Sequence, residues 1–213
     1  PRFKWRGMMM DVSRHFFTKE EVKQFIDNMV KYKYNMFHWH LTDDQGWRIE
    51  IESLPKLTSV GAWRAPRIGR WGEFSKPTPE EPKTYGGFYT HNDIKEIIQY
   101  AADRFVTVMP EIDVPGHSLA AIASYPWLAC KDTVYIVGTR WGVYEDVMCP
   151  NEKTIGFCGD VLTEVIQLFP SKLIHIGGDE FPKTRWNQST ECQAIRKNEN
   201  LKNEEELQIC FNN

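Results

Sequence analysis

Two adjacent carboxylates, Asp179 and Glu180, follow a short apolar segment and two glycines. Residues 173–176 have the composition of a buried strand, and Gly177 and Gly178 interrupt it. In a parallel α/β barrel, the carboxyl ends of the strands carry the chemistry. An Asp-Glu pair also occurs at the solvated start of a helix, where the helix dipole favours anions. The strand and the two glycines favour the functional interpretation.

Ionisable residues follow three earlier predicted strands in the same way. These strands are predicted at residues 8–12, 36–41 and 106–112, where apolar runs end in polar segments. Because the carboxyl ends of parallel strands lie on one rim of a barrel, we expect the residues after them to converge with the Asp-Glu pair. They are Arg14 and His15, Asp43 and Asp44, and Asp113 and His117.

An arginine, histidines and carboxylates in a tryptophan-rich chain suit a neutral polar substrate. The sequence has eight tryptophans, and aromatic faces stack against the C–H surfaces of sugars. The guanidinium of Arg14 has a fork of donors for vicinal hydroxyls, but a structural ion pair with a nearby aspartate explains this residue equally well. Glycoside hydrolysis is the chemistry that we expect from this set.

The roles of the two adjacent carboxylates depend on how they point. A retaining glycosidase with its own nucleophile needs carboxyl groups about 5–5.5 Å apart. Neighbours in an extended strand point to opposite sides, so Asp179 and Glu180 are poorly placed for this. Either Asp43 or Asp113 supplies the second carboxylate, or the substrate provides its own nucleophile. In the second case Glu180 is the acid/base, and Asp179 holds the group of the substrate that acts as the nucleophile.

Besides His15, four histidines lie in or near the predicted strands. His38 and His40 share one face of a strand, since side chains repeat every second residue. We favour core histidines hydrogen-bonded to neighbouring strands over a metal site, and the same interpretation holds for His175. His117 follows a Pro-Gly turn, and we expect it to be more exposed and placed to bond a catalytic carboxylate.

Predicted helices alternate with these strands. Thr18 and Glu21 form a capping box before an amphipathic segment that ends near Val30, and further helices are predicted around residues 94–101, 158–169 and 194–211. Irregular segments are expected at residues 53–90 and from about residue 118 to residue 150. The alternation predicts an α/β fold with a parallel sheet. Since a (β/α)8 TIM-type barrel needs eight strands, we expect residues 1–213 to be a partial catalytic barrel with about its first four βα units.

Composition restricts the partners. The net charge of −3, with interleaved acids and bases, argues against nucleic acid, and no apolar run is long enough to span a membrane. The five cysteines show no CxxC or zinc-type spacing. Cys130 and Cys149 bracket one loop and are candidates for a disulfide, although free thiols are favoured.

Four motifs, in this order, resemble those of the family-twenty glycoside hydrolases, the β-N-acetylhexosaminidases, and they cover nearly the whole chain. The motifs are Arg6-Gly7 with Asp11-Val12-Ser13-Arg14-His15-Phe16, His38-Trp39-His40-Leu41-Thr42-Asp43-Asp44, Pro110-Glu111-Ile112-Asp113-Val114-Pro115-Gly116-His117, and His175-Ile176-Gly177-Gly178-Asp179-Glu180.

The resemblance implies a retaining exo-β-N-acetylhexosaminidase that releases terminal β-linked GlcNAc or GalNAc from glycans or chitin oligosaccharides without a metal or organic cofactor. It implies that Asp179 orients the acetamido group of the substrate and that Glu180 is the acid/base. Arg14, Asp43 and His117 are implied to bind substrate. Supporting roles fall to Asp113, Asp44 and His175.

The resemblance also implies parts beyond these residues. The family's later barrel strands supply tryptophan walls, a tyrosine for the acetamido group and an acidic residue, and a small α+β domain usually precedes the barrel. We therefore expect the fragment alone to be inactive, and a secreted, periplasmic or lysosomal location is suggested by the family only. The alternative function is a non-catalytic carbohydrate-binding or structural fragment of such a barrel.

Overall fold

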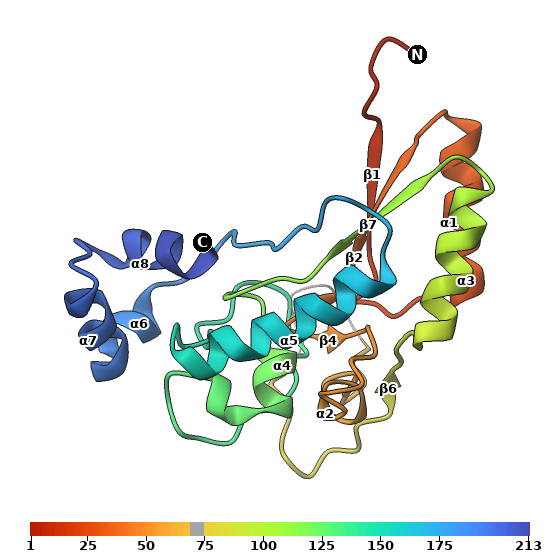
Figure 1. The fold of residues 1–213 in the computed structure, drawn as a ribbon. Coiled ribbons are helices and arrows are strands. Elements are labelled where there is room, and N and C mark those ends of the chain that lie inside the picture. Colours follow the sequence, from red (N-terminus) through yellow and green to blue (C-terminus); the bar gives the residue numbers. More distant parts are fainter. Residues whose placement is uncertain (69–74) are drawn as a thin grey trace.

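The computed structural model describes residues 1–68 and 75–213, and a three-stranded parallel sheet lies at its centre (Figure 1). The strands β1 (Gly7–Asp11), β2 (Met36–His40) and β7 (Thr107–Glu111) are ordered β1-β2-β7. In the register, His40 pairs with Asp11 on one side and with Glu111 on the other. All three carboxyl ends therefore lie at one edge, as the alternating pattern predicted.

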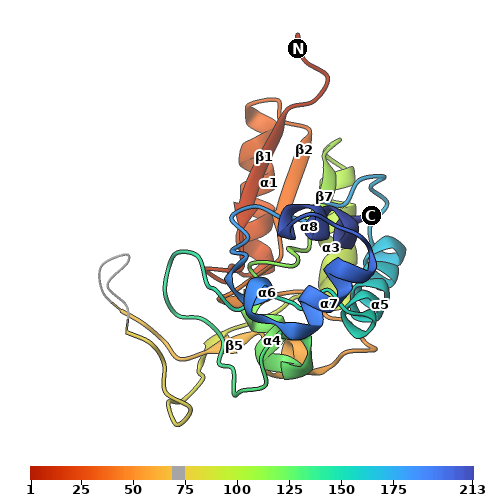
Figure 2. The same ribbon diagram turned by 90° about the vertical axis from the view of Figure 1, so that its left-hand side faces the viewer.

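Two capped helices cover one face of this sheet. Helix α1 (Lys19–Lys31) begins at the predicted capping box of Thr18 and Glu21, and α3 (His91–Ala102) begins at a second box formed by Thr90 and Asp93. Figures 1 and 2 show the two helices side by side. Lys19 on α1 bonds Asp93 on α3 at 3.0 Å, so one carboxylate serves both the cap and the contact between the helices.

Further helices lie in the second half of the chain. They are α4 (Leu119–Ser124), the 3-10 helix η1 (Pro126–Leu128), α5 (Glu152–Leu168), α6 (Thr184–Gln188), α7 (Thr190–Asn198) and α8 (Glu204–Asn212). An extended segment leads from α5 to α6–α8, which lie apart from the sheet (Figure 1). Within the described ranges, no helix has the length and apolar character of a membrane span.

The prediction that residues 173–176 form a buried fourth strand is wrong in both burial and length. Residues 173–176 make only an isolated parallel bridge, between His175 and Glu111 of β7. The backbone N–H of His175 donates to Pro110 O at 2.9 Å, and Ile112 N–H donates to His175 O at 3.0 Å. Leu173 is 51% exposed, because the segment pairs with β7 at the edge of the sheet rather than inside it.

The segments expected to be irregular contain short elements. Between residues 53 and 90 lie α2 (Lys56–Ser59) and an antiparallel pair of β5 (Trp63–Arg64) with β6 (Tyr85–Gly86), while residues 69–74 lie outside the described residues. A second two-residue pair joins β3 (Thr42–Asp43) to β4 (Gly46–Trp47), and α4 and η1 interrupt the later segment. Such elements are too short to show a period in the sequence.

A buried arginine joins the loops beneath the carboxyl ends of the strands. Arg48 is 0% exposed and donates to the carbonyl oxygens of Val12 at 3.1 Å, Ser13 at 2.7 Å and Ala62 at 2.6 Å. It also reaches Gly87 O at 3.1 Å. The hydrogen bonds to these carbonyls satisfy a charge that would otherwise be costly to bury.

Candidate active site

Arg14 is held at the end of β1 by Asp11. The Oδ1 atom of Asp11 accepts hydrogen bonds from the backbone N–H groups of Ser13 and Arg14, at 2.9 and 3.0 Å, and so forms a local turn. Its Oδ2 atom pairs with Nη1 of Arg14 at 3.0 Å, and Nη2 pairs with Oδ2 of Asp43 at 2.7 Å. The structural ion pair considered for Arg14 is therefore present, and its side chain keeps 21% exposure at the rim.

Asp43 is the fully buried centre of the rim. Besides Arg14, its Oδ2 atom lies 2.8 Å from Nε2 of His40, and its Oδ1 atom accepts from the backbone N–H of Asp44 at 2.6 Å. Burial alone would raise the pKa of Asp43, but hydrogen bonds to His117 and His40 and the charge of Arg14 lower it. Asp43 is therefore a carboxylate, fixed by cations on several sides.

His117 joins this carboxylate to the next one. Its Nδ1 atom lies 3.3 Å from Oδ1 of Asp43 and 3.3 Å from Oδ2 of Asp44, whose Oδ1 accepts from Leu119 N–H at 3.0 Å. The bonds to Asp43 and Asp44 outweigh burial and raise the pKa of His117 to about 11, so the ring is an imidazolium at neutral pH. His117 is 6% exposed, so the expectation of a more exposed histidine was wrong.

The Asp179–Glu180 pair lies on a turn rather than on an extended strand. Gly177, Gly178 and Glu180 all have positive φ, at 66°, 95° and 48°. The premise that the neighbouring side chains alternate across a strand is therefore wrong. The Oε2 atom of Glu180 lies 3.6 Å from Nε2 of His117, and the carboxylate of Asp179 lies within 4.8 Å of ligand atoms of Asp113 and His117.

Gly177 allows the turn to approach Asp113 closely. A Cβ atom at Gly177 would lie 1.7 Å from Oδ1 of Asp113, and the backbone N–H of Gly178 donates to that oxygen at 3.1 Å. Only a glycine fits this approach at this positive φ. Burial raises the pKa of Asp113 to about 7 against the opposing bond from Gly178. Asp113 thus changes its charge within the neutral range, next to Asp179.

A second layer of histidines surrounds Glu111, for which the sequence indicated no role beyond its place in a motif. The Oε2 atom of Glu111 lies 2.7 Å from Nε2 of His38 and 2.5 Å from Nδ1 of His40, and Oε1 lies 2.7 Å from Nδ1 of His175. The prediction that His38 and His40 bond neighbouring strands is confirmed. His175 forms the same kind of bond, but its side chain is 45% exposed, not buried. His40 of β2 and Glu111 of β7 are partners in the register of the two strands, and this explains the contact between their side chains.

His40 is hydrogen-bonded on both sides of its ring, to Glu111 through Nδ1 and to Asp43 through Nε2. Burial alone would lower the pKa of His40, but Asp43 and Glu111 raise it to about 10. His38, Glu111 and His175 have ligand atoms within 4.8 Å of one another, as a metal site requires. The same atoms form the hydrogen bonds described above, which account for their positions without any further group.

Two aromatic neighbours of Arg14 and His15 were not predicted individually. The guanidinium of Arg14 lies 5.1 Å from the ring centroid of Trp141, within the range of a cation–π contact. Nδ1 of His15 lies 2.6 Å from the hydroxyl of Tyr85 on β6, so His15 contacts the β5–β6 pair. The only advance signal for either contact was the abundance of aromatic residues in the irregular segments.

Taken together, the site has a cationic and anionic rim with two accessible carboxylates. The side chain of Glu180 is 63% exposed, and Asp179 is exposed as well. The buried groups around them are linked by ion pairs. The arrangement provides oxygen atoms that can exchange protons with, or accept hydrogen bonds from, a polar ligand.

Comparisons with known proteins agree with these features. The model of glycosyl hydrolase family 20, catalytic domain, matches residues 3–213. A β-hexosaminidase of Porphyromonas gingivalis is 46% identical over 212 residues, which cover 99% of this chain and 26% of that protein. A β-hexosaminidase of Vibrio furnissii is 48% identical over 210 residues, which cover 98% of this chain and 34% of that protein. The chain thus spans about a third of these relatives or less.

Solved structures show the same relationship. A crystal structure of a β-N-acetylhexosaminidase has a TM-score of 0.90 and 37% identity, over 99% of this chain and 43% of that one. The exo-β-N-acetylglucosaminidase from Vibrio harveyi, solved in complex with N-acetylglucosamine, has a TM-score of 0.81 and 43% identity, over 97% of this chain and 32% of that one.

Proposed function

The chain belongs to glycosyl hydrolase family 20, and from this we propose that its complete protein is a retaining exo-β-N-acetylhexosaminidase. Its substrates are terminal β-linked N-acetylglucosamine or N-acetylgalactosamine residues on glycans or chitin oligosaccharides. The reaction is assisted by the 2-acetamido group of the substrate and needs no metal or organic cofactor. The match of family and site motifs over residues 3–213 supports this proposal.

The reaction has two steps in this proposal. First, the acetamido carbonyl oxygen attacks the anomeric carbon while Glu180 donates a proton to the leaving oxygen. Asp179 accepts a hydrogen bond from the acetamido N–H and stabilises the positive charge of the cyclic intermediate. Second, Glu180 takes a proton from water, the water oxygen attacks the anomeric carbon, and the acetamido group is restored.

The observation that carries the assignment of Glu180 is its position beside His117. The imidazolium lies 3.6 Å from Oε2 of Glu180, and Asp43 and Asp44 hold its other nitrogen. Attraction between opposite charges orients the carboxylate while leaving it open to substrate. An exposed acid with a buried, charged orienting group fits a residue that must exchange protons with ligand and water.

The substrate-binding and supporting roles follow from the same network. We assign Arg14 to the hydroxyls of the sugar, because it lies at the rim with 21% exposure, and the buried Asp43 contributes to substrate binding by fixing its guanidinium. His117 positions Glu180. Supporting residues are Asp44, which holds His117, Asp113, which shapes the turn before Asp179, and His175, which bonds Glu111.

We also propose that residues 1–213 form about the first four βα units of a (β/α)8 barrel. Three parallel strands and a fourth segment bridged to β7 support this order, as does the fraction of each relative that the chain covers. The remaining strands would complete the pocket for the acetamido group. A retaining mechanism of this kind requires reacting atoms about 3–3.5 Å apart. A rim built from only about four βα units does not hold the acetamido group at this distance from the anomeric carbon.

The proposal is tested by assaying the complete protein with a chromogenic β-N-acetylglucosaminide. Release of the chromophore, with a β-configured sugar as the first product detected by NMR, is expected. Binding of N-acetylglucosamine without turnover would instead support the alternative of a non-catalytic carbohydrate-binding protein. The 213-residue chain, assayed in parallel, is expected to show little turnover, and comparable kcat/KM for both would overturn the partial-barrel proposal.

A further inference from the structure

Three thiols from distant parts of the chain meet in a cluster that the candidate active site does not include. Cys130 follows η1, Cys149 precedes α5, and Cys192 lies in the first turn of α7. The Sγ atom of Cys192 lies 3.4 Å from that of Cys149 and 3.7 Å from that of Cys130. All three are free thiols, and all three sulfur atoms lie within 4.8 Å of one another.

These separations match a known coordination geometry. Zinc–sulfur bonds of about 2.3 Å in a tetrahedral site place the sulfur atoms about 3.8 Å apart. The two Sγ–Sγ distances at Cys192 are close to that value, so small side-chain shifts would suffice. A disulfide, by contrast, needs an S–S distance of about 2.05 Å and uses only two of the three thiols.

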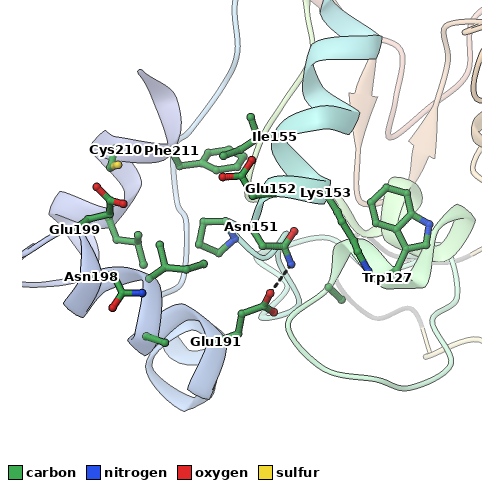
Figure 3. Close-up of a pocket in the computed structure, with 15 residues that line it drawn as sticks. Trp127, Asn151, Glu152, Lys153, Ile155, Glu191, Asn198, Glu199, Cys210 and Phe211 are labelled. Carbon is green, nitrogen blue, oxygen red and sulfur yellow. Dashed lines mark hydrogen bonds between the residues drawn. The ribbon is translucent and has the colours of Figure 1, made fainter.

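A carboxylate beside Cys149 can become the fourth ligand after a side-chain shift, because its oxygen is not one of the ligand atoms that lie within 4.8 Å of one another. The Oε2 atom of Glu191 lies 3.4 Å from Sγ of Cys149, and Nδ2 of Asn151 donates to Oε1 of Glu191 at 3.0 Å (Figure 3). An outer hydrogen bond of this kind fixes the orientation of a ligating carboxylate. Both residues line a cleft of about 600 Å³ between the start of α5 and helices α7 and α8, so the carboxylate of Glu191 lies between this cleft and Cys149.

The surroundings of the sulfur atoms favour a closed, structural site. Cys149 and Cys192 are 0% exposed and pack in an apolar cluster with Val147, Phe181 and Trp186. The N-terminal turn of α7, which has nine residues, favours a thiolate at Cys192. The N–H of Trp186 donates to Met148 O at 2.8 Å and so secures the segment that carries Cys149.

We propose that Cys130, Cys149, Cys192 and Glu191 bind one thiophilic divalent cation, with zinc as the ion that best fits three thiolates and a carboxylate. On binding, the thiols that are protonated lose their protons to solvent, and no electron transfer occurs. The ion connects η1, the loop before α5, and α7. It therefore fastens the helices α6–α8, which carry no strand of the sheet, to the rest of the chain.

Zinc content of the complete protein tests this site directly. The protein is purified with a reductant, loaded with Zn²⁺, freed from excess metal and analysed for zinc by mass spectrometry. The Cys192→Ser and Glu191→Gln variants are compared with Cys158→Ser, which changes a thiol on α5 outside the cluster. We expect Cys192→Ser to bind one equivalent less than Cys158→Ser, and Glu191→Gln to release zinc faster to a chelator.

A measurement on the unmodified protein keeps the test independent of folding in the variants. Zn²⁺ should slow alkylation of Cys130, Cys149 and Cys192 by iodoacetamide but not that of the exposed Cys210, as read by peptide mass spectrometry. Loading with Co²⁺ should give a sulfur-to-cobalt charge-transfer band. Equal zinc content in Cys192→Ser and Cys158→Ser, unchanged alkylation, or a disulfide to Cys192 that persists in the reduced preparation would overturn the proposal.

Discussion

His117 Nε2 lies 3.6 Å from Oε2 of Glu180, and Nδ1 of the same ring contacts the buried Asp43–Asp44 pair at 3.3 Å. One imidazolium thus connects two carboxylates that are excluded from water to one that is 63% exposed. The buried pair fixes the charge and the plane of the ring. The position of Glu180 therefore depends on residues from two other strand ends.

Glu180→Gln in the complete protein is expected to lower kcat by about 10²–10⁴-fold, because the amide cannot transfer the proton. Binding of N-acetylglucosamine, measured by calorimetry, is expected to persist. Glu205→Gln, which changes an exposed acid on α8, is the matched control and should leave kcat unchanged. An unaltered kcat for Glu180→Gln would remove this residue from the mechanism.

His117→Asn is expected to lower kcat by about tenfold or more, with a smaller change in KM, since Glu180 loses its orienting charge. The double variant with Glu180→Gln distinguishes positioning from an independent role. If His117 acts through Glu180, the double variant should be no slower than Glu180→Gln alone. Additive losses in kcat would contradict a positioning role.

Arg14→Ala is expected to raise KM and to lower kcat/KM by about 10- to 150-fold. This range corresponds to the loss of one charge-assisted hydrogen bond to a sugar hydroxyl, about 1.5–3 kcal/mol. Steady-state kinetics with the chromogenic substrate give both constants. Wild-type KM and kcat/KM, together with a lower Tm, would show that Arg14 serves only its ion pairs with Asp11 and Asp43.

Asp113→Asn should change how stability depends on pH. The raised pKa of about 7, against 3.8, means that the folded wild type binds a proton more tightly than the unfolded chain. Wild-type stability from this group is therefore lost as pH rises from about 4 to 7. The variant should gain relative stability over that window, by at most about 4 kcal/mol, and no further above pH 7. Urea unfolding at several pH values measures this, and a pH-independent difference would contradict it.

Gly177→Ala should destabilise the protein and disturb the site. The added Cβ meets Asp113 Oδ1 at 1.7 Å, and the positive φ adds about 1–2 kcal/mol for a residue with a side chain. Gly156→Ala on α5 is the control, because a Cβ there meets nothing within 4 Å and alanine favours a helix. We expect a lower Tm and kcat for Gly177→Ala only. Equal Tm values for both variants would argue against the close approach.

Local patterns were sufficient to predict the parts of the fold that depend on neighbours in sequence. The capping box of Thr18 and Glu21, the helical face after it, and the shared face of His38 and His40 follow from spacing alone. The convergence of Arg14, Asp43 and His117 followed from the rule that parallel strands end on one rim.

Features that depend on tertiary pairing were missed. Residues 173–176 look like a buried strand, but their burial depends on which strands flank them, and within residues 1–68 and 75–213 their one bridge is to β7. Glu111 has no sequence signal that it would meet three histidines. The meeting of Cys130, Cys149 and Cys192 depends on η1, the loop before α5 and α7 being brought together in space.

Arg48 has a consequence for how the base of the site unfolds. Its guanidinium donates hydrogen bonds to the carbonyl oxygens of Val12 and Ser13 just after β1, and to those of Ala62 and Gly87. Opening any one of these segments would leave a donor of the buried guanidinium without an acceptor. These segments are therefore expected to exchange their amide hydrogens as one cooperative unit, with Arg14 held steady for as long as that unit is closed.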